Sequence, residues 1–143
     1  MAAEGTLHAG FVKLTFAATA DDHALRKGES DSRWKALATT ESTVALSVST
    51  DNLTPTDLAS ASTFRLNPSA AVNLTGFAGG FLSSRVVALM NVGAYAITIK
   101  HESTSSLASN RFSLAGSADY TLDPNSVALF FYDVTGQRWR KVS

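Results

Sequence analysis

Apolar and polar residues alternate with a period of two along several short stretches of the chain. In residues 94–101, for example, Tyr95, Ile97 and Ile99 are separated by small or polar residues. This period places successive side chains on opposite faces of a strand. The alternation therefore predicts strands with one buried face.

The same pattern recurs over most of the chain, with Gly, Pro, Asn and Asp between the periodic stretches. From residue 63 on, the stretches follow one another at the short spacing typical of a β-sandwich. The fold class that we expect is all-β: an antiparallel β-sandwich or jelly roll with an extended N-terminal arm or strand-loop-strand. The predicted strands are 5–18, 42–50, 63–66, 71–75, 84–91, 94–101, 111–114, 119–122, 126–134 and 137–142.

We expect two regions: residues 1–62, an N-terminal strand with a docking or oligomerisation arm, and residues 63–143, the sandwich. The short Asn91-Val92-Gly93 break predicts an antiparallel hairpin between strands 84–91 and 94–101. Large apolar residues of the predicted strands should supply most of the core: Val86, Leu89, Tyr95, Ile97, Ile99, Phe112, Leu114, Leu122, Leu129, Phe131 and Trp139.

Strand 126–134 is apolar on both of its faces. With Leu129 and Phe131 assigned to the core, Val127, Phe130 and Tyr132 are surplus to a single sandwich. A strand with two apolar faces is either central to a larger core or buried against another subunit. These three residues are therefore a candidate oligomer interface, and the alternative is that an N-terminal strand of the same chain covers them.

Residues 21–40 are too polar to fold alone and too long for an ordinary connection. We interpret them as a docking arm that becomes ordered on a partner, with apolar anchors and cations that pair with the partner's acidic groups. The alternative is that Trp34 closes one end of its own sandwich. The candidate docking residues are Leu25, Arg26, Lys27, Arg33, Trp34, Lys35 and Leu37.

The amino-acid composition limits the classes of partner that we expect the chain to bind. Twelve basic and twelve acidic residues give a formal net charge of zero, which argues against nucleic acid as a partner. The basic C-terminal stretch around Trp139 is interpreted as a solvated strand edge. Apolar runs fall far short of the ~20 residues that span a membrane, and no signal peptide opens the chain. Cysteine is absent, so disulfides and cysteine-ligated metals are excluded.

Candidate catalytic and metal-binding motifs are incomplete. Asp21-Asp22-His23 has no second histidine at a metal-ligand spacing, and Gly76–Gly80 is followed by no lysine. His101-Glu102-Ser103 lacks the nucleophile elbow, so the loop backbone is expected to satisfy His101. We therefore predict no enzyme activity, no cofactor and no metal. Carboxylates that a glycosidase would need are scattered: Glu29, Asp31, Glu41, Glu102 and Asp119.

The second half of the chain resembles a module of bacteriophage virion proteins, found in tail fibres, tail-tip proteins and capsid decoration or spike proteins. The motifs are LMNVGAYAITIKHESTSSLASNRF, then LAGSADYTLDPNSVALFFYD, then QRWRKVS, and the likeness covers about residues 62–143. The resemblance implies a location in the virion, after assembly in the host bacterial cytoplasm. It also implies a homotrimer whose further partner is the major capsid protein or another virion protein.

The expected function is a non-enzymatic structural protein of a tailed bacteriophage, a homotrimeric capsid decoration (cement or head spike) protein. This choice depends on the lack of a shaft-like repeat or coiled coil that would carry a fibre tip outward. The alternative is a tail-fibre or tail-tip receptor-binding module. Loops 67–80 and 102–110 would then contact host surface glycans.

Overall fold

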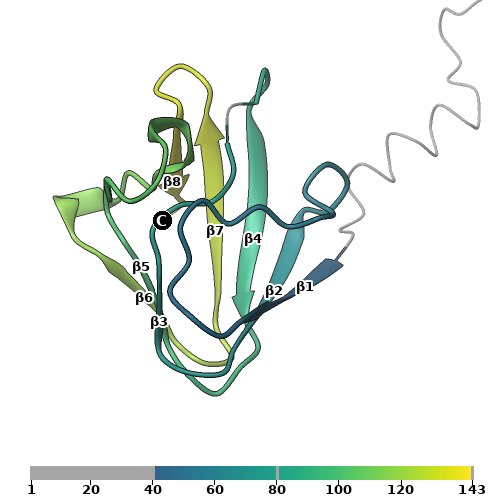
Figure 1. Cartoon of the computed structure of the whole chain (residues 1–143). Helices are drawn as coiled ribbons and strands as arrows, with labels where there is room; N and C mark the ends of the chain where they lie inside the picture. The colour runs from purple at the N-terminus through teal and green to yellow at the C-terminus, as the bar shows by residue number, and fades with distance from the viewer. Residues whose placement is uncertain (1–40, 80, 143) are drawn as a thin grey trace, which may run out of the picture. The chain divides into compact units, whose positions relative to one another are not determined.

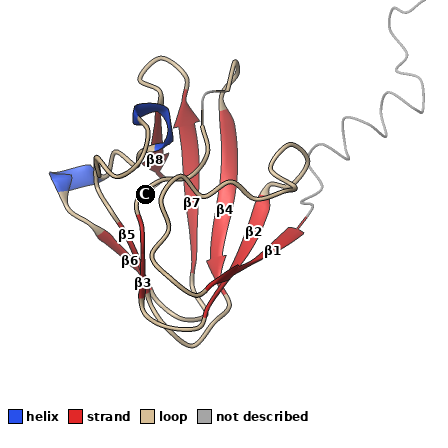
Figure 2. Ribbon diagram, in the orientation of Figure 1, coloured by secondary structure: helices blue, strands red, loops and turns tan. Residues whose placement is uncertain are grey.

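The computed structural model describes residues 41–79 and 81–142, which form two sheets (Figure 1). The five-stranded sheet has the order β1-β2-β4-β7-β8, and the three-stranded sheet has the order β3-β5-β6. In Figure 2 the described chain outside the strands is loop with short helices, which are of the 3-10 type. The predicted all-β sandwich is confirmed. The elements are β1 (Glu41–Leu46), β2 (Thr63–Pro68), β3 (Val72–Leu74), β4 (Arg85–Asn91), β5 (Ile97–Ile99), η1 (Ala108–Asn110), η2 (Ala115–Ser117), β6 (Tyr120–Leu122), β7 (Val127–Asp133) and β8 (Arg138–Lys141).

The strand pairing is mixed, which corrects the antiparallel part of the predicted fold. β1 with β2, β2 with β4, and β3 with β5 are parallel pairs, while β4 with β7, β7 with β8, and β5 with β6 are antiparallel. From β2 to β5 the chain alternates between the two sheets. Neighbours such as β2 and β4 therefore run in the same direction. Hydrophobic periodicity reports which face is buried and carries no information on strand direction.

The predicted hairpin between strands 84–91 and 94–101 is also wrong. β4 lies in the five-stranded sheet and β5 in the three-stranded sheet, so the chain crosses from one layer to the other after Asn91. The buried Asn91 side chain stabilises this crossing. Its Nδ2 donates to the carbonyl oxygens of Tyr95 (2.8 Å) and Leu122 (2.9 Å), and its Oδ1 accepts from the Gly93 N–H (3.1 Å).

Aromatic side chains fill one part of the space between the sheets. Trp139 is fully buried, with its ring edge-on to Phe77 and Tyr132 at centroid distances of 5.4 and 5.0 Å. Its indole Nε1 donates to the carbonyl oxygen of Phe77 at 2.8 Å, which satisfies the one polar atom of the ring. The aromatic cluster is therefore apolar, and the indole N–H within it is hydrogen-bonded.

The core prediction is confirmed for seven residues and wrong for four. Leu89, Ile97, Ile99, Phe112, Leu114, Leu122 and Trp139 are buried. Val86, Tyr95, Leu129 and Phe131 are 50, 48, 45 and 38% exposed. On β4 and β7 the buried residues are the sequence neighbours of the exposed ones: Val87 follows Val86, and Phe130 precedes Phe131. A one-residue error in the choice of face exchanges every side chain of a strand, and strands that are apolar on both faces do not reveal it.

The predicted boundary at residue 62 lies inside the sandwich. β1 pairs along its whole length with β2, and the connection that follows it includes the buried residues Leu53 and Ala61. Residues 41–62 are therefore part of the sandwich rather than of an arm. The predicted strand 5–18 lies outside the described residues. The predicted strand 111–114 is reduced to isolated bridges, in which Phe112 joins His101 and Trp139.

Candidate interaction surface

The outer face of the five-stranded sheet carries a continuous apolar area in its centre. On β4 and β7, Val86 lies opposite Phe131, Ala88 opposite Leu129, and Met90 opposite Val127. Beside them, the Val142 N–H donates to the Leu129 carbonyl oxygen at 2.8 Å, which extends the area past the end of β8. We call these residues the β4–β7 apolar face: Val86, Ala88, Met90, Val127, Leu129, Phe131 and Val142.

Of the three predicted interface residues, only Val127 lies on this face, and it is 48% exposed. Phe130 and Tyr132 are fully buried between the sheets, so their assignment to an oligomer interface is corrected. The physical reason is the alternation of β7, whose even-numbered positions point into the core. A signal for the correct surface was present in the sequence, because 84–91 and 126–134 are both apolar on both faces.

Ion pairs border the β4–β7 apolar face on both sides. On the β1–β2 side, Arg65 lies 3.8 Å from Glu41, and on the β8 side Arg140 Nε lies 2.8 Å from Asp133 Oδ2. A depression of about 440 Å³ continues the face at one end, and it is lined by Arg65, Met90, Asn91, Val92, Asn125 and Val127.

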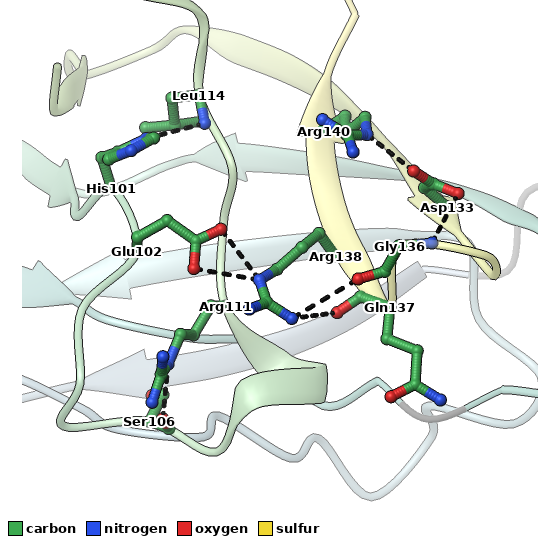
Figure 3. A network of polar contacts seen from close by, with 10 residues as sticks. All are labelled: His101, Glu102, Ser106, Arg111, Leu114, Asp133, Gly136, Gln137, Arg138 and Arg140. Atoms are coloured by element: carbon green, nitrogen blue, oxygen red, sulfur yellow. Dashed lines mark hydrogen bonds and ion pairs between the residues drawn. The ribbon is translucent and has the colours of Figure 1, made fainter. Parts of the chain in front are cut away.

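Asp133 closes the β7–β8 hairpin (Figure 3). Its Oδ1 accepts from the backbone N–H groups of Thr135 and Gly136, both at 3.1 Å. The Gly136 N–H and then the Arg140 guanidinium hold the pKa of the Asp133 carboxyl below its ordinary value of 3.8. The predicted hairpin at 134–136 is confirmed, although the residue with positive φ is Gln137 (φ 50°) and not Gly136.

We expect the Asp133→Asn variant to be less stable than the native chain at neutral pH and progressively less different from it in acid. A carboxyl whose pKa is lowered by folding stabilises the fold above its unfolded pKa, and this stability is lost as the pH falls through the folded pKa. Denaturant unfolding of both proteins from pH 7 to below pH 3.8 measures the difference. A difference that stays constant over this range would contradict the assignment.

A polar network ties loop 102–110 to the β7–β8 hairpin (Figure 3). Arg138 Nε lies 2.8 and 3.0 Å from the two carboxylate oxygens of Glu102. The Arg138 Nη1 also donates to the Gln137 carbonyl oxygen at 3.0 Å, and Arg111 Nε donates to the Ser106 carbonyl oxygen at 2.9 Å. The loop proposed for glycan contact is thus held by charge-assisted hydrogen bonds.

Asn52 joins the same loop to the connection after β1. Its Oδ1 accepts from the Leu107 N–H (2.7 Å) and from Asn110 Nδ2 (2.8 Å), while its own N–H donates to Ser106 Oγ (2.9 Å). Asn110 in turn accepts from the Gly79 N–H at 2.9 Å. The Asn110 side chain therefore links Gly79 to loop 102–110, and the Asn52 side chain in turn holds Asn110 and Leu107 of that loop.

Asn52→Ala is expected to be about 1–3 kcal/mol more destabilising than Asn125→Ala. Both asparagines have left-handed backbone (φ 49° and 60°), so the backbone cost of alanine is shared. The hydrogen bonds of the described residues include two to the Asn52 side chain and none to that of Asn125. Denaturant unfolding measures the difference, and hydrogen exchange in residues 102–110 should rise only in Asn52→Ala. Equal destabilisation by the two variants would contradict the role of the side chain.

Titratable side chains among the described residues that were candidates for catalysis are engaged in structural contacts. His101 Nδ1 accepts from the Leu114 N–H at 3.0 Å, which confirms that the loop backbone satisfies this histidine (Figure 3). Asp119 contacts Lys100 Nζ at 2.5 Å and accepts from the His101 N–H at 2.8 Å. The Lys100 contact, followed by the His101 N–H, lowers the pKa of Asp119. Within residues 41–79 and 81–142 no three His, Asp or Glu side chains come together as a metal site would require.

Several residues named in the sequence predictions lie outside the described part of the chain. Asp21-Asp22-His23, Glu29 and Asp31 lie in residues 1–40, as do all seven docking-arm candidates from Leu25 to Leu37. Their roles stay predictions. In the described part of the chain no helix is long and apolar enough to cross a membrane.

The two layers with their closed aromatic core define the class of protein, a β-sandwich module. Residues 37–140 match the family model of the phage depolymerase C-terminal beta sandwich domain. This match spans most of the chain, so the chain belongs to that family, a phage tail-associated structural module. The resemblance to a phage virion β-module is thereby confirmed, and the match includes β1 as the fold does. No curated protein and no solved structure matches the chain.

Proposed function

We propose that this chain supplies a non-catalytic structural module to the tail of a phage particle. The single observation that carries the proposal is the match of residues 37–140 to the C-terminal β-sandwich of phage depolymerases. The structure supports a structural role. Glu102 and Asp119 are each paired with a cation, and His101 is bonded to the backbone, so these side chains are used in holding loops together.

The family favours the tail over the capsid. The expected capsid decoration function depended on the lack of a shaft-like repeat in this chain. That lack does not distinguish a module attached to the capsid from one attached to the tail. Membership in a depolymerase domain family supports a location in the tail. Capsid decoration and binding to host surface glycans become outcomes that the experiments distinguish.

The location is tested by reconstitution with separated parts of the particle. Tails and capsids are purified from the phage that encodes the chain, after its own copies have been removed, and each is incubated with the labelled full chain. Saturable binding to tails with none to capsids is expected. Binding to capsids alone would establish decoration instead, and uptake by host cells without binding to either part would favour a receptor-binding module.

The non-catalytic role is tested with the purified full chain and surface polysaccharide of the host. No increase in reducing ends is expected over time. A depolymerase of established activity on the same material is the positive control. Release of reducing ends by the chain would contradict the proposal.

A further inference from the structure

A small cavity lies between β6, an edge strand of the three-stranded sheet, and the end of β8, an edge strand of the five-stranded sheet. Its volume is about 210 Å³, and it lies outside loops 67–80 and 102–110. Pockets for drug-sized ligands measure about 300–1,000 Å³, so this one suits a single small ring. The residues that line it are Leu114, Ala115, Ala118, Asp119, Tyr120 and Lys141.

Two inward-facing strand positions at this cavity carry polar groups. Lys141 lies two positions after the buried Trp139 on β8, and Tyr120 lies two positions before the buried Leu122 on β6. Each side chain therefore lies on the inner side of its strand. Lysine is rarely placed toward a core unless its ammonium group reaches water or a partner. The cavity is thus a mixed polar and apolar site at the margin of the core.

The ammonium group of Lys141 is available to a ligand. Its Nζ lies 4.8 Å from the centroid of the Tyr120 ring and donates to the Val142 carbonyl oxygen at the long distance of 3.4 Å. Within residues 41–79 and 81–142, no acid pairs with Lys141 and no group is hydrogen-bonded to the Tyr120 hydroxyl. The cation–π contact holds the ammonium group beside the ring.

The Asp119 carboxylate adds an acceptor to the wall of the cavity. Its Oδ2 contacts Lys100 Nζ at 2.5 Å, and its Oδ1 accepts from the His101 N–H at 2.8 Å. A carboxylate offers about four lone-pair sites, so about two remain for further donors. The side chain is 38% exposed, which leaves these sites accessible. The cavity therefore combines a cation, an acceptor of hydrogen bonds and an aromatic ring.

We propose that this cavity binds a hexuronate unit of an acidic polysaccharide. The sugar carboxylate pairs with the Lys141 ammonium group, and ring hydroxyls donate to the Asp119 carboxylate. The apolar C–H groups of the sugar ring lie against Tyr120 and the apolar part of the wall. The proposal goes beyond the tail assignment and does not depend on it.

Other small anions fit the same groups less well. A phosphate has no hydroxyl donors beyond its own acid groups and is repelled by the Asp119 carboxylate. An acidic peptide side chain brings the anion for Lys141 but no hydroxyl donors for Asp119. A neutral sugar brings the hydroxyls and leaves Lys141 without an acid. A hexuronate carries both kinds of group on one ring.

The test is a titration of the isotope-labelled full chain with methyl β-D-glucuronoside, followed by NMR. The methyl group imitates the bond to the next unit of a polysaccharide. We expect saturable shifts of the amide signals of residues 114–120 and Lys141, with a dissociation constant of about 1 mM for a ligand of this size. Methyl β-D-glucoside, which lacks the carboxylate, should bind about five- to tenfold more weakly.

A pair of variants tests the role of the cation. Lys141→Met keeps the apolar stem and removes the charge, so it should weaken glucuronoside binding about five- to tenfold while the circular dichroism stays native. Arg140→Met is the matched control, because Arg140 is the preceding residue of β8, points to the opposite face and pairs with Asp133 at 2.8 Å. It should leave the affinity unchanged.

The comparison of the two glycosides uses the native chain, so it does not depend on the folding of a variant. The absence of saturable shifts overturns the proposal, and so do shifts confined to residues outside the cavity. Equal affinities for the glucuronoside and the glucoside, or equal losses in Lys141→Met and Arg140→Met, also overturn it.

Discussion

Phe130→Ala is expected to lower the free energy of unfolding by about 3–5 kcal/mol, the usual cost of truncating a large buried aromatic residue. Phe130 is fully buried, and its ring lies edge-on to Phe112 at a centroid distance of 5.1 Å. Alanine would leave a cavity between the sheets that neighbouring side chains fill only in part. Denaturant unfolding measures the loss.

Phe131→Ala is the matched control, because it removes the same side chain from the next residue of β7. Phe131 is 38% exposed on the β4–β7 apolar face, so the expected loss of folding free energy is only about 1 kcal/mol. If the two variants lose equal stability, or Phe131→Ala loses more, the assignment of faces along β7 is wrong.

Asn91→Ala is expected to cost about 2–4 kcal/mol, because each buried polar group left without a partner costs about 1–3 kcal/mol. The Asn91 side chain is fully buried where the chain crosses between the sheets. Alanine would leave the Tyr95 and Leu122 carbonyl oxygens without their side-chain donor at the crossing. Chemical denaturation measures the cost, and hydrogen exchange should rise in residues 92–96.

Asn67→Ala provides the comparison for Asn91→Ala. Asn67 lies on β2 with an exposed side chain, so its replacement should change stability by no more than about 0.5 kcal/mol. A loss for Asn91→Ala as small as that for Asn67→Ala would mean that the buried asparagine does not hold the crossing between the sheets.

The sequence predicted the strands well, because short periodic stretches bounded by turn residues are a local signal. Strand 126–134 and the turn at 134–136 are examples, and both are confirmed within a residue or two. Strand direction has no such local signal, since it depends on which sheet the chain enters next. The crossing at Asn91 depends on hydrogen bonds to Tyr95 and Leu122, and a contact 31 residues away is not visible in a local pattern.

The sequence predicted a contact surface on β7, but two of the three residues predicted for it are buried in the core. Because β7 is apolar on both faces, we predicted an oligomer interface on this strand, and the existence of that interface stays a proposal. The choice between Phe130 and Phe131 was wrong, because period-two alternation does not distinguish two apolar faces. The partner strand offered no correction, since Val86 and Val87 on β4 are equally apolar.

The bonded loops could not be found from the sequence either. Asn52 contacts Leu107 and Asn110, which lie 55 and 58 residues further along the chain. Glu102 and Arg138 are likewise separated by 36 residues and meet only because β8 lies next to the loop. Polar residues in loops are common, and the pairs that form bonds are decided by tertiary structure.

The most direct test of the tail assignment is an electron cryomicroscopy map of the intact phage particle, compared with a map of particles that lack this chain. We expect density for the two-layered sandwich at the tail in the first map and its loss in the second. Density that disappears from the capsid shell instead, with an unchanged tail, would contradict the account.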